Sequence, residues 1–226
     1  MTKIILVRHG HVEGISPERF RGRADLELTE LGRRQAEETA ARIAASWTLA
    51  ALYSSPLSRC RVTAEAIGRC FGLTPVPLPE LIDIDYGEWQ GLTPEDVRRK
   101  SPEALATWYR SPQWADIPGG ESLQEVLARV VAALRNVIDS RPEDTVVIVG
   151  HDSVNRVILL HAHDLPLSRY WRLGQDPCAI NEIDFSGGEF TVRSVNETWH
   201  LTRGPDVLKE ARRDALARDP NVARSQ

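Results

Sequence analysis

Three short apolar segments separated by longer amphipathic ones restrict the fold of this chain more than any other feature. The segments KIILV (3–7), ALYSS (51–55) and TVVIVG (145–150) are apolar or β-branched and end in polar or turn residues. Continuous apolar runs of this length are typical of strands that are buried on both faces. Strands that alternate with helices indicate a largely parallel sheet with helices on both faces. We therefore predict an α/β fold, a three-layer α/β/α sandwich around a mostly parallel central sheet.

Amphipathic patterns between the apolar segments predict helices. Residues 123–138 have the most regular pattern, with apolar side chains at every third or fourth position, as expected of a helix that packs one face against a core. Ser122 and Glu125, in the preceding SLQE, have the spacing of a capping box. Further helices are expected over 29–47, with Thr29 as N-cap, over 56–71 with an initial proline, and from about 93 and 101 onward.

The pattern changes toward the end of the chain. AINEIDF and EFTVRSV flank a Gly-Gly pair, which predicts a β-hairpin over 179–195. The sequence over 204–226 is charged and rich in alanine, which favours a peripheral helix and a frayed tail. We therefore expect a single domain over 1–203, followed by that charged C-terminal segment.

Composition argues against several classes of function. The chain has 226 residues and a net charge of −4, so no general positive field would attract nucleic acid. The sequence contains no apolar run of membrane-spanning length, and we expect no signal peptide. Cys60, Cys70 and Cys178 form no CxxC pair, which favours reduced thiols in a cytoplasmic protein over disulfides or a cysteine zinc site. We expect no nucleic-acid or membrane partner, and a homodimer is left open.

Arginine and histidine side chains follow the three predicted strands. Arg8 and His9 come directly after the first strand, Arg59 comes shortly after the second, and His151 comes directly after the third. Ligands of open α/β sheets bind beyond the carboxyl ends of the strands. We therefore expect the two guanidiniums and the two imidazoles to meet in one pocket.

Such a pocket suits a phosphate dianion. Arginine binds phosphate oxygens in a bidentate manner with a permanent charge, and a helix that starts after GHDS would add its N-terminal dipole. A neutral imidazole can attack phosphorus and carry the phosphoryl group as phosphohistidine. Neighbouring arginines favour that neutral form and stabilise charge on the transferring group. The residues at the strand ends therefore predict phosphoryl transfer through a histidine.

A leaving alkoxide needs a proton, so a carboxyl group is expected near this pocket. The segment ELIDIDYGEWQG (80–91) has a loop-like composition and could overhang the site. Spacing alone does not choose among its four carboxyl groups, which belong to Glu80, Asp83, Asp85 and Glu88.

The HxH pair of His9 and His11 raises a different chemistry. Residues i and i+2 of a strand face the same side and could chelate a metal ion, as in hydrolases built on eight-stranded barrels. The chain is short for such a barrel, Arg8 is unsuited to a metal site, and Gly10 interrupts the strand geometry that chelation requires. We expect neither a metal nor another cofactor.

Five motifs occur in the order LVRHG, SSPLSRCRVTAEAI, DIDYGEWQG, PGGES and VVIVGHDSVNR. In this combination the chain resembles the histidine phosphatase (phosphoglycerate mutase-like) superfamily from about Lys3 to Leu201. RHG alone is a weak signal, whereas the ordered set is specific. The resemblance implies the phosphoglycerate mutase-like fold. It also implies a metal-independent phosphomonoesterase that acts on a small phosphorylated metabolite through phosphohistidine.

The resemblance also implies roles for individual residues. His9 would be the phosphorylated nucleophile, and Arg8, Arg59 and His151 would bind the phosphoryl oxygens. The family's proton donor, commonly glutamate, lies four residues before the glycine of the YG step, where this chain has Asp83. Aspartate is one methylene shorter, so either the backbone comes closer or a water relays the proton. The more conspicuous glutamate of YGEWQG would then have no such role.

Substrate contacts are expected around the mouth of the pocket. RFRGRADLELTELG resembles the family's RFQGRxDxPLTxxG, which places Arg21 and Arg23 where they could touch a remote anionic group of the substrate. His11 and Val12 replace the Glu or Gln and the threonine that many relatives have there. The positions expected to bind substrate are His11, Arg21, Gly150 and Asp152.

Two further functions are kept as alternatives. Mutases of the family carry inserted segments that enclose the substrate and exclude water, whereas this compact chain resembles the phosphatase branch. A phosphoglycerate mutase-type phosphotransferase is the alternative within the same chemistry. A non-catalytic relative that binds phosphorylated ligands is the alternative of another class, motivated by Asp83 in place of glutamate. The sequence does not identify the physiological substrate.

Overall fold

The computed structural model describes residues 1–202, and the expected helix and tail over 204–226 lie outside that range. Its strands are β1 (Thr2–Arg8), β2 (Ala51–Ser54), β3 (Val76–Pro77), β4 (Thr145–Gly150), β5 (Ile180–Ser186) and β6 (Glu189–Glu197). They form one six-stranded sheet in the order β3-β2-β4-β1-β5-β6. Strands β1 to β4 pair in parallel, whereas β5 is antiparallel to both β1 and β6. The prediction of a mostly parallel sheet is confirmed.

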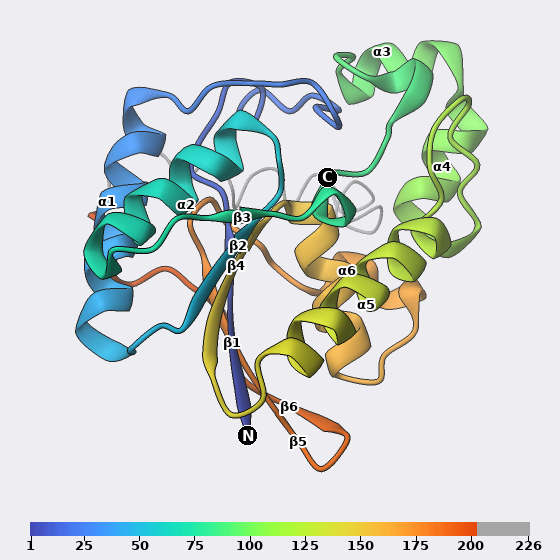
Figure 1. Cartoon of the computed structure of the whole chain (residues 1–226). Helices are drawn as coiled ribbons and strands as arrows, with labels where there is room; N and C mark the ends of the chain where they lie inside the picture. Colours follow the sequence, from blue (N-terminus) through green and yellow to red (C-terminus); the bar gives the residue numbers. More distant parts are fainter. Residues whose placement is uncertain (203–226) are drawn as a thin grey trace.

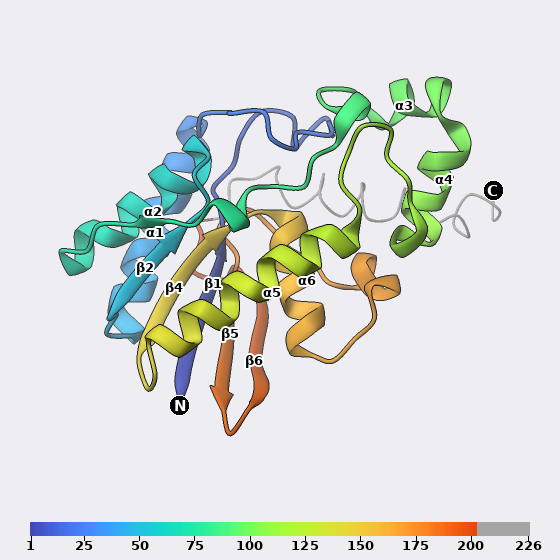
Figure 2. The same ribbon diagram turned by 45° about the vertical axis from the view of Figure 1, so that its right-hand side comes forward.

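Helices cover both faces of this sheet, as Figures 1 and 2 show. The helices are α1 (Glu30–Ser46), α2 (Ser58–Phe71), α3 (Pro94–Lys100), α4 (Pro102–Arg110), α5 (Leu123–Ser140) and α6 (Asp152–Ala162). Helices α1 and α2 form one outer layer, and α5 and α6 cross the other face of the sheet (Figure 2). None of the helices within residues 1–202 has both the length and the apolar character that crossing a membrane requires.

Alternation of side chains along β1 explains the two layers. Ile4 and Leu6 belong to the apolar cluster that includes α5 and α6, whereas Ile5 and Val7 belong to the cluster that includes α1 and α2. Successive side chains of a strand point to opposite faces. Because both faces are covered, all four residues are fully buried, which is why β1 has a continuous apolar sequence.

The predicted caps account for two of the helix boundaries. The Thr29 hydroxyl accepts the backbone N–H of Gly32 at the start of α1. Ser122 and Glu125 form the expected capping box of α5, each side chain accepting the other's backbone N–H. The prediction for α2 was two residues early, because Leu57 is an extended N-cap residue and the helix begins at Ser58.

The expected hairpin is formed by β5 and β6. Gly187 and Gly188 have φ values of 61° and 88°, which suit the primed turns that connect twisted antiparallel strands. The two-residue strand β3 was not predicted. It pairs only through Val76 and Pro77 with the edge of β2, and so short an edge strand leaves no periodic pattern in a sequence.

The loop between β1 and α1 runs above the carboxyl ends of the strands and extends toward α3 (Figure 1). Its position is fixed by two backbone hydrogen bonds, from Phe20 N–H to Leu92 O at 3.0 Å and from Gly91 N–H to Phe20 O at 2.7 Å. This loop is therefore held over the region where the predicted site residues lie.

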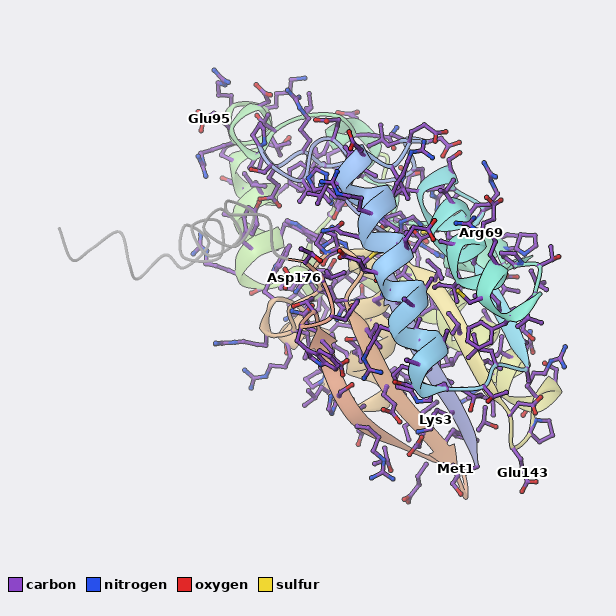
Figure 3. The ribbon with its side chains drawn as sticks, turned by 90° about the vertical axis from the view of Figure 1, so that its left-hand side faces the viewer. Met1, Lys3, Arg69, Glu95, Glu143 and Asp176 are labelled. Atoms are coloured by element: carbon purple, nitrogen blue, oxygen red, sulfur yellow. The ribbon has the colours of Figure 1, made fainter. Side chains whose placement is uncertain are left out.

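The amino ends of β1 and β4 lie at the opposite end of the sheet, away from this loop. Figure 3 labels Met1, Lys3 and Glu143 there, and the Met1 amino group lies 3.9 Å from the Glu143 carboxylate. Since β1 and β4 are parallel, their carboxyl ends lie side by side at the other end of the sheet, where Arg8 pairs with Gly150.

Candidate active site

The pairing of β1 with β4 brings the two predicted histidines together. Arg8 is the register partner of Gly150, and the His9 N–H donates to the Gly150 carbonyl at 3.0 Å. His9 and His151 therefore follow neighbouring strand ends, and their ring centroids lie 5.3 Å apart. Both imidazoles are buried.

The surroundings of His9 leave one ring nitrogen available for reaction. Its Nδ1 lies 2.7 Å from the Gly10 carbonyl, and since a carbonyl only accepts hydrogen bonds, Nδ1 carries the proton in the neutral ring. The lone pair is then on Nε2. Burial, and after it the positive charges of Arg59 and Arg8, hold the pKa of His9 well below its usual value. His9 is therefore a neutral imidazole with a free Nε2 lone pair, the form that a nucleophile needs.

Arg59 is fully buried and connects the main parts of the site. Its Nε–H donates to Nδ1 of His151 at 3.2 Å, and one Nη2–H donates to the Asp83 carboxylate at 3.1 Å. Two further bonds, to the carbonyls of Ala24 at 2.7 Å and Gly22 at 2.8 Å, fix the guanidinium. The β1–α1 loop thus supplies acceptors that hold Arg59 against β4.

Arg8 is the second buried guanidinium. It donates to the Gln175 carbonyl and lies 3.8 Å from the Asp152 carboxylate. Its Nε–H is buried without a hydrogen-bond partner among residues 1–202. A buried donor without a partner is costly, and an anionic ligand between the two arginines would satisfy it.

His151 is oriented by a hydrogen bond at each of its two ring nitrogens. Because Nδ1 accepts from Arg59, Nε2 carries the proton and donates to the Ser55 hydroxyl at 2.8 Å. Burial, followed by the charges of Arg59 and Arg8, keeps the pKa of His151 well below its usual value. His151 therefore contributes a neutral imidazole in a fixed orientation.

Among the four candidate carboxyl groups, the site contains that of Asp83. One Asp83 oxygen accepts from Arg59 and lies 3.6 Å from His151 Nδ1. The other accepts from the Ser153 hydroxyl and from a backbone N–H. Asp85 instead pairs with Arg23 at 3.1 Å, and the remaining two candidates, Glu80 and Glu88, are exposed.

The residues expected to bind substrate fall into different environments. Arg21 lines a cavity of about 40 Å³ beside Asp83, together with Asp152. Gly150 faces the site through its carbonyl group, which accepts from His9. The His11 ring instead contacts the Thr29 hydroxyl at 2.9 Å, on the α1 side. His9 and His11 thus have separate partners, an arrangement unlike that of a chelating pair.

Arg23 does not reach into this cavity. Its guanidinium pairs with Asp85 at 3.1 Å and with Glu121 at 3.4 Å, so it ties the β1–α1 loop to the segment after Asp83. Two nearby acids already compensate its charge, and its contact with a substrate anion stays a prediction.

Comparisons with known proteins show the family to which this fold belongs. Residues 4–198 match the model of the histidine phosphatase superfamily (branch 1). The chain belongs to this superfamily. Phosphoserine phosphatase 1 of Hydrogenobacter thermophilus is 33% identical over 201 residues, which cover 89% of this chain and 95% of the relative.

Two further comparisons extend this relationship. The metal-independent phosphoserine phosphatase of Arabidopsis thaliana is 33% identical over 162 residues, which cover 71% of this chain and 68% of that protein. The solved structure of Bacillus stearothermophilus YhfR has a TM-score of 0.84 at 28% identity, covering 88% of this chain and 99% of its own. The histidine phosphatase fold thus extends over nearly all described residues.

Sequence reasoning missed several supporting residues of this histidine phosphatase site. Ser55 contacts His151, Ser153 contacts Asp83, and the Cys60 thiol donates to the Gly150 carbonyl at 3.3 Å. Burial raises the pKa of the Cys60 thiol far above its usual value, so this cysteine packs behind the site as a neutral group. Ser55 and Cys60 lie within SSPLSRC, but nothing in that motif shows which ring they contact.

Proposed function

We propose that this chain is a phosphomonoesterase that hydrolyses small phosphorylated metabolites through a phosphohistidine on His9, without a metal. The observation that carries the proposal is the buried, neutral His9, whose free Nε2 lies in a pocket that also contains Arg8 and Arg59. Two guanidiniums compensate a phosphate dianion, and a neutral imidazole beside them is a suitable nucleophile.

In the first step, Nε2 of His9 attacks phosphorus while Arg8 and Arg59 bind the non-bridging oxygens. The ester P–O bond breaks, and its electron pair stays on the leaving oxygen, which takes a proton from the Asp83 carboxyl group. Fixed guanidiniums stabilise the charge that develops on the transferring group. The products of this step are an alcohol and phosphohistidine.

In the second step, a water molecule attacks the phosphohistidine and the Asp83 carboxylate takes its proton. The N–P bond breaks, inorganic phosphate leaves, and His9 is again neutral. Asp83 therefore serves as acid and then as base, so the same carboxyl group is ready for the next cycle. Ser153 and Arg59, which hydrogen-bond to its two oxygens, would keep it oriented between the steps.

The names of the relatives suggest a starting point for the substrate. Two of the relatives are phosphoserine phosphatases, and one of these is described as metal-independent. A panel of phosphorylated metabolites that includes O-phosphoserine and 3-phosphoglycerate, assayed with and without EDTA, tests both the activity and its independence from metals.

We expect release of inorganic phosphate that EDTA does not reduce and that His9→Ala abolishes. Full activity of His9→Ala, or loss of activity with EDTA and recovery with zinc, would contradict the proposal. Binding of phosphate without any turnover would instead indicate a non-catalytic relative. Product analysis with 3-phosphoglycerate separates phosphate release from the isomerisation that a mutase would catalyse.

A further inference from the structure

Hydrogen-bond donors bind both oxygens of the Asp83 carboxyl group. One oxygen accepts from the Arg59 guanidinium at 3.1 Å. The other accepts from the backbone N–H of Ile84 at 3.0 Å and from the Ser153 hydroxyl. A protonated carboxyl group must itself donate to an acceptor. The guanidinium and the backbone N–H can only donate, so a protonated Asp83 needs a partner that can also accept.

Of these three donors, the Ser153 hydroxyl can reverse its role. A hydroxyl has one O–H donor and two lone pairs, so it donates to the Asp83 carboxylate and accepts from the Asp83 carboxylic acid. When it accepts, its own proton is free to be donated elsewhere. His151 Nδ1 lies 3.6 Å from the carboxylate but is unsuited to this task, because its lone pair already accepts from Arg59 at 3.2 Å.

Asp83 is also fixed through its backbone. Its carbonyl group accepts from Arg129 at 3.3 Å and from Arg23 at 3.4 Å. Only one methylene joins this backbone to the carboxyl group, so the acid has little freedom to move toward a substrate. A leaving oxygen must therefore come to the acid directly, or receive its proton from a group that the acid contacts.

Ser153 is placed where it could contact the leaving group. It is the second residue of α6, which begins directly after His151, so its position is fixed relative to the phosphoryl pocket. Together with Asp83 it lines a cavity of about 40 Å³. An acid catalyst must lie within hydrogen-bond reach of the oxygen that it protonates, so the proposed reaction brings the leaving oxygen to this cavity.

The small volume of the cavity favours a side chain over water as the proton carrier. A space of about 40 Å³ holds a few water molecules at most, and an entering leaving group would displace them. Three aromatic residues, Tyr86, Trp108 and Trp171, form part of its wall and supply little hydrogen bonding for water. The Ser153 hydroxyl, which is buried and already bound to Asp83, remains in place.

We propose that Ser153 is a catalytic residue that relays the proton between Asp83 and the leaving oxygen. This inference rests on the proposed phosphatase function and adds a step to its acid–base route. As the ester P–O bond breaks, the leaving oxygen takes the Ser153 hydroxyl proton, and the Asp83 acid proton moves to Ser153 Oγ. Asp83 becomes a carboxylate and Ser153 is again a hydroxyl. When water attacks the phosphohistidine, a water proton passes to Ser153 while the Ser153 proton returns to Asp83.

A proton inventory of the wild-type enzyme counts the protons that move in this step. The rate of alcohol release in the first turnover is measured by rapid quenching in mixtures of H₂O and D₂O, with the alkyl phosphomonoester that the enzyme hydrolyses fastest. A relay moves two protons together, so we expect the rate to depend on the deuterium fraction along a curve. A straight line, which indicates a single proton, or the absence of an isotope effect would overturn the inference.

Variants then assign the second proton to Ser153. Ser153→Ala should lower the first-turnover rate for the alkyl ester at least about tenfold, a part of the effect of general acid catalysis, and should turn the curve into a straight line. The first-turnover rate for p-nitrophenyl phosphate should change little, because its leaving group is stable as an anion. Ser153→Thr keeps the hydroxyl and should restore most of the rate for the alkyl ester.

Ser140→Ala is the matched control. It also removes one serine hydroxyl, but from the exposed end of α5, where Oγ donates to the Val137 carbonyl at 3.0 Å. Both rates and the curve should stay as in the wild type. Circular dichroism and the melting temperature of each variant check that it is folded.

A folded Ser153→Ala variant that loses the same factor with both esters would overturn the relay, because Ser153 would then act on the phosphoryl group. If that variant does not fold, the inventory of the wild type decides alone. Turnover of p-nitrophenyl phosphate separates the two levels. If the wild type hydrolyses it and the inventory for the alkyl ester is a straight line, only the relay fails and Asp83 donates directly. If the wild type hydrolyses no ester, the phosphatase function fails with it.

Discussion

His9 and His11 are only two positions apart, yet they lie in different environments. His9 is 1% exposed and faces His151 and two arginines, whereas the His11 ring contacts Thr29 at the start of α1. Between them, a Cβ on Gly10 would lie 2.5 Å from the carbonyl oxygen of Gly32. Glycine at this position therefore allows α1 to approach the end of β1, and the two rings separate there.

At the scale of single residues, the assignment of Asp83 as the proton donor leads to a prediction. Asp83→Asn should lower kcat by about 10²–10³-fold for alkyl phosphomonoesters, whose leaving oxygen needs a proton. The loss should be far smaller for p-nitrophenyl phosphate, whose leaving group is stable as an anion. Steady-state kinetics with both types of ester measures the difference.

Glu88→Gln is the matched control for this experiment. Its carboxylate is exposed, and the substitution should change kcat/KM by less than about twofold, as expected for a surface position. If Glu88→Gln shows the large, leaving-group-dependent loss and Asp83→Asn does not, the acid has been assigned to the wrong residue.

The strand ends could be predicted from the sequence because each is marked by a local change from apolar to polar residues. Arg8, His9, Arg59 and His151 all follow such a change, and the structure brings them together. The contacts of Ser55 and Ser153 could not be predicted, because they join residues 96 and 70 positions apart. Arg23 could not be distinguished from Arg21, since the acids that pair with Arg23 come from a distant segment.

At the scale of elements, the helices with caps and strong periodicity were predicted most accurately. The capping box at the start of α5 and the Thr29 cap of α1 are local signals, and both are present. Strand β3 has two residues and is formed only through its contact with β2. The start of α2 was predicted too early because Pro56 resembles a first-turn proline. The backbone at Leu57 is extended, so the helix begins at Ser58.

At the scale of the molecule, the two buried histidines link stability to pH. The folded protein holds the pKa values of His9 and His151 below those of the unfolded chain, so the unfolded state binds more protons in the range below about pH 6.5. Their contribution to stability is therefore complete above that pH and is lost as the pH falls. A histidine that stays neutral in the folded state lowers the free energy of unfolding by about 1 kcal/mol between pH 7.5 and 5.5.

Urea unfolding of the wild type and of His9→Gln at these two pH values measures that contribution. The variant lacks one of the two buried imidazoles, so its free energy of unfolding should fall by about 1 kcal/mol less than that of the wild type. Equal pH dependence of the two proteins would show that His9 is not held neutral in the folded state. The comparison between proteins cancels the effect of carboxyl groups common to both.

The central claim is that His9 carries the phosphoryl group. The most direct measurement is rapid quenching in alkali during turnover of a phosphomonoester, followed by mass spectrometry of the peptide that contains His9, with the His9→Ala variant alongside. We expect an acid-labile, base-stable phosphate on His9 in the wild type, and neither phosphate nor turnover in the variant. Turnover that persists in His9→Ala, or a phosphate trapped on a different residue, would contradict the account.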